Sequence, residues 1–429
     1  MAGAPVHTLL FLEPGHFHAT LTLRVPHPRV ADEIVVYAHD GPELRDFLAL
    51  VDRFNTRGEG ATRWRPIVIV DAEPLGRLIA ERRGDVVVLA GRNGGKARTF
   101  HRLHAAGFHV LADKPWLVEP DDLEDIRASL AGWPLVMEIM TGRHDVAARL
   151  NKRLIDAPDV FGTFRDIVPA LDFDGVHCLE KLVDGAPLRR PWWFFDVRVQ
   201  GSGAVDIPTH LVDRSQWLLE GRGVEAPLRL LSAGVSPTRV PLESFRRITG
   251  EADFPGALHT VTEGDTLSYR CNSELVFQIG DVIVRGTTRW DVAPAHGGDT
   301  HAAVARGTRA DIRMDQGPHT ENRRRLLVEP RGEIESAGRR IGDTLKAMAD
   351  EFPGVGVVPA DAGRYELTIP RELDAGHESH FTKVRDEFLR AVDDRRWSAV
   401  LAARTLAKYT LLAEAAARAA TAAHADGRR

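Results

Sequence analysis

Residues 85–115 read DVVVLAGRNGGKARTFHRLHAAGFHVLADKP, and this stretch decides the fold expected for the first part of the chain. Two short apolar runs, DVVVLA and FHVLA, enclose a segment of helical composition that begins near Gly95. Strands that are apolar on both faces are typical of a sheet covered by helices on both sides. The stretch therefore predicts a strand–helix–strand unit in which the two strands are parallel.

The same alternation of apolar runs and helical patterns extends over the first 140 residues or so. Strands are expected at residues 7–12, 32–38, 65–70, 85–90, 108–112 and 134–140, and helices are expected to begin near His16, Pro42, Pro74, Gly95 and Pro120. We therefore predict a doubly wound α/β domain of the Rossmann type over residues 1–141. Ligands of such sheets bind at the carboxyl ends of the strands, near the point where the strand order reverses.

The pattern changes after residue 141. A helix is expected over HDVAARLNKRLIDAPD, and longer segments with alternating hydrophobicity follow it at residues 163–173, 228–235, 273–292 and 301–314. The Gly280-Asp281 pair inside the third of these segments is a candidate hairpin turn. We expect a second, α+β domain at residues 142–376, built on a large, mostly antiparallel open sheet, and C-terminal helices at residues 377–429 that pack back on the domains.

Composition excludes several classes of protein. The chain has 429 residues, a formal net charge of -5, 43% hydrophobic and 27% charged residues, which is typical of a soluble protein of two or three domains. No apolar run approaches the ~18 residues of a membrane span, and the acidic balance gives no reason to expect nucleic acid or an anionic membrane as a partner. The short apolar run at the N-terminus has no basic leader, and two cysteines do not make a disulfide scaffold, so a cytoplasmic location is expected.

The turn after the first strand, LEPGHFHATL at residues 12–21, is where a dinucleotide-binding fold normally has G-x-G-x-x-G. Only the second glycine remains, as Gly15, and Glu13 and His18 occupy the other two positions. Gly15 lets the backbone approach a pyrophosphate, and the following helix offers unpaired N–H groups, whereas Glu13 would repel phosphate if it pointed inward. The candidate cofactor contacts here are Gly15, His16, Phe17 and His18; the alternative is an ordinary turn with a surface pair of histidines.

Three other strand ends carry candidate cofactor contacts. Asp40, after the second strand, is placed to accept hydrogen bonds from an adenosine ribose and would disfavour a 2′-phosphate, which favours NAD over NADP. Capping of the next helix explains Asp40 equally well. The remaining candidates are Gly91, Arg92 and Asn93 after the fourth strand, and Asp113, Lys114 and Pro115 after the fifth.

Lys114 attracts attention because the chain has only seven lysines against 49 arginines. Pro115 restricts Lys114 to an extended conformation and prevents a helix from beginning there, so the lysine is expected at a strand tip. The alternative is a surface lysine beside Asp113.

Residues 201–219, GSGAVDIPTHLVDRSQWLL, predict a helix with two ionisable groups on one stripe. Asp206 and His210 are four residues apart and would lie one above the other, followed by Asp213 and Trp217. The opposite stripe would face a core and consists of Ile207, Leu211, Leu218 and Leu219. A solvated helix would show the same pattern.

The order of these elements resembles the Gfo/Idh/MocA oxidoreductases. The match rests on HVLADKP, which is similar to the family's H-V-x-x-E-K-P, and on residues 201–219, which are similar to its G-G-G-x-x-x-D-x-x-x-H-x-x-D-x-x-x-W-L-L. The resemblance implies a nicotinamide cofactor, a sugar, glycoside or cyclitol substrate, and a catalytic group of Lys114, Asp206 and His210. The chain departs from the family in its glycine turn, in Asp113 for the usual Glu, and in Gly91-Arg92-Asn93 for Thr-Pro-Asn.

The residue types suit that chemistry. Removing a hydride from a carbinol carbon requires a base for the hydroxyl proton, and the reference pKa of a histidine such as His210 is about 6.5. Lys114 would stabilise the developing alkoxide, and Asp206 would orient the pair. Candidate substrate contacts in the second domain are Trp193, His177, Asp299 and His301; core packing for Trp193 and surface ion pairs for the others are the alternatives.

Two other functions remain open at this stage: a redox-neutral hydrolase or lyase on a retained NAD, and a protein that senses a nucleotide or binds a partner without catalysis. No metal site is expected, because the histidine pairs His16/His18, His101/His104 and His377/His380 have no third ligand nearby in the sequence. Relatives of this kind often pair through the open sheet, so a homo-oligomer is also considered.

Overall fold

The computed structural model describes residues 6–183, 186–221, 227–293, 298–374 and 376–426, and the chain divides into two compact units. The first unit comprises residues 1–141, 198–201 and 376–413. The second comprises residues 142–197, 202–375 and 414–429.

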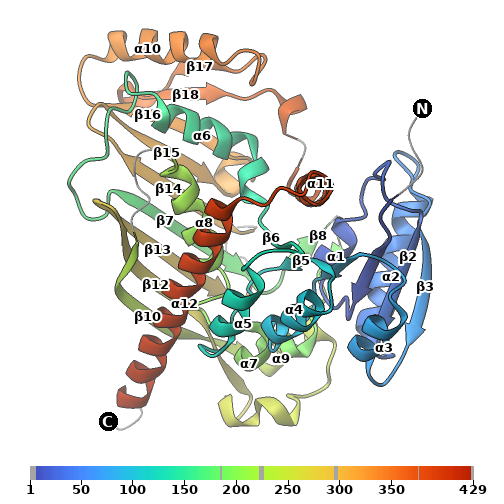
Figure 1. Ribbon diagram of the computed structural model, residues 1–429. Helices are drawn as coiled ribbons and strands as arrows, with labels where there is room; N and C mark the ends of the chain where they lie inside the picture. The colour runs from blue at the N-terminus through green and yellow to red at the C-terminus, as the bar shows by residue number, and fades with distance from the viewer. Residues whose placement is uncertain (1–5, 184–185, 222–226, 294–297, 375, 427–429) are drawn as a thin grey trace. The chain divides into compact units, whose positions relative to one another are not determined.

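The sheet of the first unit has the predicted doubly wound form (Figure 1). Its six strands are all parallel and follow the order β3 (Arg65–Val70), β2 (Glu33–Ala38), β1 (Leu9–Leu12), β4 (Val86–Leu89), β5 (His109–Asp113) and β6 (Val136–Ile139). The order reverses between β1 and β4, which places the expected ligand site at the carboxyl ends of these two strands. The crossover helices are α1 (His18–Leu21), α2 (Pro42–Thr56), α3 (Pro74–Glu81), α4 (Lys96–Ala105) and α5 (Asp122–Ser129).

A C-terminal helix completes the core of this unit. Phe388 of α11 (His380–Asp393) is fully buried in one apolar cluster with Phe11 of β1 and Phe47 of α2. Burial of each such side chain stabilises the fold by about 1.5–3 kcal/mol. The buried guanidinium of Arg385 donates to the carbonyl oxygens of Thr22 and Val25, at 2.7 and 2.6 Å, so α11 also fixes the chain that follows α1.

A buried polar network holds the segment that follows β5. Tyr409, in α12 (Ala399–Asp426), stacks on Trp116 with ring centroids 5.7 Å apart. The Tyr409 hydroxyl accepts a hydrogen bond from the backbone N–H of Trp116 at 2.9 Å. The same hydroxyl and the ammonium of Lys408 both donate to the carboxylate of Glu138. Because Trp116 comes two residues after Lys114, this network fixes the position of the strand tip that carries the lysine.

The second unit is built on the large sheet that the alternating segments predict (Figure 1). Among its described strands, neighbours pair antiparallel except for β13 and β7, which are parallel. The order is β10 (Leu228–Pro241), β12 (Thr266–Ile279), β13 (Val282–Asp291), β7 (Leu171–Cys178), β14 (Thr300–Arg306), β15 (Ala310–Gln316), β16 (Arg325–Pro330), β18 (Tyr365–Thr368) and β17 (Gly356–Pro359), with β11 (Thr262–Glu263) beside β12.

The hairpin expected at Gly280-Asp281 is present. Ile279 pairs with Val282, and Gly280 has a φ of +57°, a conformation that favours glycine. The helices and short strands of this unit are α6 (Val146–Asp156), α8 (Pro208–Leu218), α9 (Leu242–Thr249), α10 (Ile334–Ala347), β8 (Leu182–Val183) and β9 (Ala186–Pro187). Helix α7 (Val197–Gln200) belongs to the first unit from Arg198 onward. Figure 1 shows α6 and α8 on one face of the large sheet.

Two expected elements begin later than the sequence indicates. The alternating segment at residues 163–173 is a strand only from Leu171, since Ile167 and Val168 are exposed and Pro169 has no N–H for a ladder. Helix α8 begins at Pro208, because a proline without an N–H fits the first helical turn. Asp206 therefore lies in the turn that precedes α8 and not, as the sequence pattern indicated, on the helix itself.

Across the described ranges, no helix of this chain combines the length and apolar character that a membrane crossing requires.

The Glu138–Lys408 pair gives a first prediction, because both side chains are at most 4% exposed. Replacing Lys408 by Met leaves the carboxylate of Glu138 buried without its cation. We expect the free energy of unfolding, measured by denaturant titration, to fall by about 3–5 kcal/mol.

The matched control is Lys383→Met, the same change at an exposed lysine of α11, which should alter the free energy by no more than about 0.5 kcal/mol. Equal effects of the two substitutions would contradict the role of the buried pair.

Candidate active site

The loops that follow β1 and β4 touch each other at the point where the strand order reverses. The His16 N–H donates to the carbonyl oxygen of Ala90 at 2.9 Å. A Cβ on Gly91 would lie 2.3 Å from the carbonyl oxygen of Glu13 and 3.2 Å from the nitrogen of Gly15, so only glycine permits this approach. Two predicted cofactor contacts, Gly15 and Gly91, are therefore neighbours in the structure.

The helix after this loop is short. Helix α1 has only four residues, His18–Leu21, and Phe17 at its N-cap makes no side-chain capping bond. The carbonyl of Thr22, at its C-cap, accepts a hydrogen bond from Arg385. One turn has little dipole, and the approach of its first N–H groups to a pyrophosphate stays a prediction.

Glu13 does not point toward a phosphate. Its carboxylate accepts hydrogen bonds from the backbone N–H of His39, at 2.7 Å, and from Nδ1 of the same residue, at 2.9 Å. This hydrogen bond raises the pKa of His39. Glu13 therefore links the β1 loop to the end of β2, and the repulsion considered for an inward carboxylate does not arise.

Asp40 lies at the carboxyl end of β2, with a side chain that is 75% exposed and 3.2 Å from Arg45. The N-cap of α2 is Gly41, which makes no side-chain capping bond, so Asp40 does not serve as the helix cap. Capping therefore does not explain Asp40, and its role as a ribose acceptor stays a prediction.

Asn93 and Lys96 form a buried hydrogen-bonded pair beside the loops. The amide of Asn93 donates to the carbonyl oxygen of Gln200 at 2.8 Å, and Lys96 donates to the Asn93 side-chain oxygen at 2.6 Å and to the carbonyl of Asp113 at 2.9 Å. Arg92, in contrast, is 55% exposed and pairs with Glu43 at 3.3 Å. Sequence reasoning missed Lys96, although the scarcity of lysine that singled out Lys114 applies equally to it.

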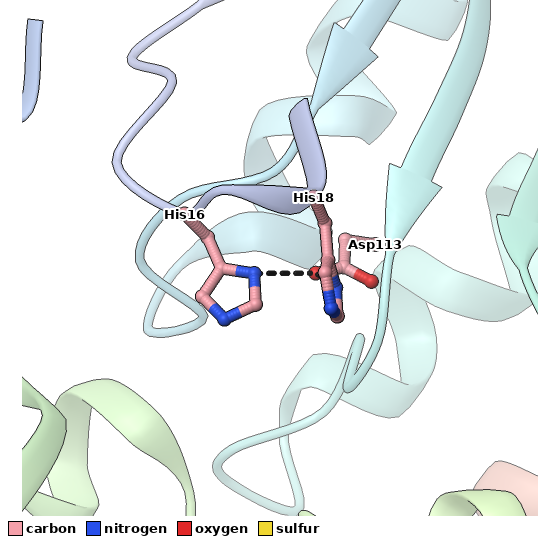
Figure 2. A group of neighbouring side chains, drawn as sticks. All are labelled: His16, His18 and Asp113. Atoms are coloured by element: carbon pink, nitrogen blue, oxygen red, sulfur yellow. Dashed lines mark hydrogen bonds and ion pairs between the residues drawn. The ribbon is translucent and has the colours of Figure 1, made fainter. Parts of the chain in front are cut away.

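The tip of β5 holds a cluster of His16, His18 and Asp113 (Figure 2). Oδ2 of Asp113 accepts a hydrogen bond from Nδ1 of His18 at 2.8 Å and lies 3.5 Å from Nδ1 of His16. Burial lowers the pKa of His18 to about 3. Burial acts against ionisation of Asp113, but its interactions with His18 and His16 outweigh that effect and hold its pKa well below the usual range.

Lys114 follows directly and is half-buried, and Pro115 after it is buried. The Rossmann-type sheet therefore gathers its predicted contacts, from Gly15 to Pro115, at the ends of β1, β2, β4 and β5.

In the second unit, Asp206 is held in a tight turn against β12. Gly203 donates its N–H to the carbonyl of Arg270 at 2.9 Å, and a Cβ there would lie 2.6 Å from the carbonyl oxygens of Cys271 and Asn272. Asp206 is 6% exposed, and His210, in the first turn of α8, is half-buried. This close approach explains the second glycine of the GSG pattern, Gly203.

Three of the four predicted substrate contacts of this unit come together. His177 and His301 have ring centroids 5.0 Å apart, and Nδ1 of His177 lies 3.8 Å from Oδ2 of Asp299. Burial lowers the pKa of His301 to about 3. Burial opposes ionisation of Asp299, but bonds to His177 and Lys181 hold its pKa below the usual range.

Neighbours of this cluster were not predicted. Lys181 donates to Oδ2 of Asp299 at 2.7 Å, and the Trp290 indole stacks on His177 with centroids 5.0 Å apart. Trp290 pairs directly with His177 in the ladder between β13 and β7, a register that the sequence does not specify. Trp193, the fourth predicted contact, is 1% exposed, so its ring belongs to the core, which is the alternative considered for it.

Comparisons with known proteins agree with this architecture. A family model described as "Putative oxidoreductase C terminal domain" matches residues 150–420. A crystal structure of a "putative oxidoreductase" from Parabacteroides merdae is 31% identical, covers 98% of this chain and 99% of its own, and has a TM-score of 0.92. The chain therefore belongs to the Gfo/Idh/MocA oxidoreductases, as the sequence motifs indicated.

More distant structures share the fold. Levoglucosan dehydrogenase, solved with NADH and levoglucosan, is 15% identical with a TM-score of 0.62, covering 96% of this chain and 97% of its own. KijD10, a 3-ketoreductase from Actinomadura kijaniata solved with NADP and TDP-benzene, is 13% identical with a TM-score of 0.58, covering 95% and 96%. A search of curated proteins found no match.

The depressed pKa of His301 predicts a pH dependence of stability. An unfolded histidine titrates near pH 6.5, whereas His301 in the folded chain stays neutral down to about pH 3. As the pH falls through this window, the unfolded state binds a proton that the folded state does not, so the folded state loses stability by up to about 1.4 kcal/mol per pH unit.

His301→Gln should remove this contribution. The unfolding free energy of the wild type minus that of the variant should therefore fall from pH 7 to pH 4 in denaturant titrations. The exposed His259→Gln serves as the control. If the wild-type value minus the variant value instead rises as the pH falls, His301 is protonated in the folded protein.

Proposed function

We propose that this oxidoreductase uses NAD(P), with NAD favoured, to transfer hydride between the nicotinamide and a hydroxyl carbon of a sugar, glycoside or cyclitol. The observation that carries the proposal is the contact between the β1 and β4 loops at Gly15 and Gly91, beside a β5 tip that bears Lys114. That edge of a parallel sheet is where dinucleotides bind.

The residues present fit a dinucleotide. Gly91 allows the backbone of two loops to approach, Asp40 offers an exposed carboxylate at the end of β2, and Glu13 is turned away by its bonds to His39. A carboxylate at the position of Asp40 favours a ribose hydroxyl and repels a 2′-phosphate, which supports NAD. The nicotinamide cofactors bound to KijD10 and levoglucosan dehydrogenase support the same class of cofactor.

In this proposal, the nicotinamide accepts or supplies the hydride when it is bound. His210 removes the proton of the substrate hydroxyl in the oxidative direction and returns it in the reductive direction. Lys114 stabilises the negative charge that develops on the oxygen, and Asp206 orients this pair. Each group is supported by its placement within its own unit: Lys114 at a strand tip, Asp206 in the Gly203 turn and His210 in the first turn of α8.

A polyhydroxylated substrate suits the second cluster. Asp299 is an ionised acceptor, His301 is a neutral imidazole that both donates and accepts, and Trp290 provides a flat apolar surface beside His177. Sugars present hydroxyl groups and apolar ring faces together. Levoglucosan, the ligand of one structural neighbour, is such a molecule and supports this class.

The direct experiment is to purify the protein, denature it and identify any released nicotinamide by mass spectrometry, then to assay turnover on a panel of sugars and cyclitols. We expect the released nicotinamide to be NAD. We also expect at least one sugar or cyclitol of the panel to be oxidised in a cofactor-dependent reaction. Bound NAD with conversion of substrate but no net change in cofactor would instead identify the redox-neutral class. No bound cofactor and no uptake of NAD or NADP would contradict the proposal and favour a non-catalytic binding protein.

Single substitutions separate catalysis from binding. Lys114→Ala and His210→Asn should each lower kcat by about 10²–10⁴-fold, because each removes a group that acts on the reacting hydroxyl. Steady-state assays measure kcat, and fluorescence titration measures NAD affinity, which His210→Asn should leave unchanged. Lys383→Ala, at an exposed lysine, is the control. Full activity of His210→Asn would remove this histidine from the mechanism.

A further inference from the structure

We infer that His16, His18 and Asp113 form a binding site for one divalent transition-metal ion of the zinc class. The ligand atoms are Nδ1 of His16, Nδ1 of His18 and Oδ2 of Asp113 (Figure 2). The three residues are among the predicted cofactor contacts, but none belongs to the proposed catalytic group. The inference does not rest on which substrate the enzyme uses.

The spacing of the three atoms suits such an ion. Bonds of about 2.0–2.1 Å in tetrahedral geometry require ligand atoms roughly 3.3–3.4 Å apart. Nδ1 of His16 and Nδ1 of His18 lie 3.5 and 2.8 Å from Oδ2 of Asp113, and one ligand atom of each residue lies within 4.8 Å of the others. The two distances to Asp113 lie on either side of the spacing that such an ion requires.

The ligand types also suit it. The three side chains present two imidazole nitrogens and one carboxylate oxygen, which are ligands that zinc prefers in proteins. Nδ1 of His18 now donates to Asp113, so metal binding requires the ring proton to move to Nε2.

His16 provides an unused donor. Its Nδ1 is buried and makes no hydrogen bond, although it points at the carboxylate across 3.5 Å. A buried polar atom without a hydrogen bond costs about 1–3 kcal/mol, and coordination would satisfy it. In the bare cluster this nitrogen approaches the Asp113 carboxylate at 3.5 Å without a hydrogen bond, and a cation would bind both atoms.

The surroundings hold the ligands in place. The His18 ring packs on Phe381 with centroids 4.4 Å apart, and the His16 ring packs on Phe17 at 4.6 Å. The backbone of Asp113 is held by β5 and by the Lys96 bond to its carbonyl. Three protein ligands fixed in this way leave a fourth position open for a water molecule or another oxygen ligand.

A second group, His177, Asp299 and His301, has similar ligand types and is the natural comparison. There, however, the Lys181 ammonium already lies 2.7 Å from Oδ2 of Asp299. A metal ion would have to displace that cation, so we place the site at Asp113.

The test uses full-length protein without an affinity tag, stripped with EDTA, dialysed and titrated with Zn²⁺ by calorimetry and with Co²⁺ by visible absorption. Wild-type protein should bind one Zn²⁺ at this site, and bound Co²⁺ should show the d–d bands of low coordination number. Because loss of an outer-shell partner alone weakens metal binding by about 10–100-fold, His16→Ala should weaken it by at least about tenfold. His18→Ala should act in the same direction.

His39→Ala, an exposed histidine bonded to Glu13, is the matched control and should bind zinc as wild type does. His301→Ala should also have no effect. The inference is overturned if wild-type protein takes up no Zn²⁺, if His16→Ala binds it unchanged, or if His301→Ala abolishes binding. Because zinc is titrated without dinucleotide, and NAD can be titrated in EDTA, failure of this site and failure of the proposed function give different results.

Discussion

The carboxylate of Asp113 is buried at the tip of β5, and the arrangement of the neighbouring loops depends on keeping it satisfied. A buried charge costs several kcal/mol unless hydrogen bonds and opposite charges compensate it. His18 and His16 approach its side chain from the β1 loop, while Lys96 binds its carbonyl and joins it to Asn93. Through its carboxylate and its backbone carbonyl, Asp113 thus links the ends of β1, β4 and β5, the edge of the sheet at which a ligand is expected.

Most of the architecture was predictable because it follows from hydrophobic patterning. Strands that are apolar on both faces gave the parallel sheet, and alternating runs gave the large sheet of the second unit. The turn preceding α8, in contrast, depends on how closely Gly203 approaches β12. That approach is a tertiary contact, so helical spacing alone did not show that the helix begins after Asp206.

The candidate sites were predictable only in part, for the same physical reason. His16 and His18 were recognised as a pair, but their third partner, Asp113, is distant in the sequence and meets them only when β1 and β5 enter one sheet. In the same way, the register of β13 against β7 places Trp290 beside His177. Scarcity of lysine pointed to Lys114, and the same reasoning extended to all seven lysines would have found Lys96 and Lys408, which are both buried.

We propose that Lys114 and His210, which lie on segments far apart in the sequence, act on one hydroxyl group. A double-mutant cycle on kcat tests it most directly, using Lys114→Ala, His210→Ala and the double variant. Groups that act as a unit are strongly non-additive, so we predict that the double variant is within about threefold of the slower single variant. If the two losses multiply instead, the two side chains act independently and the claim is wrong.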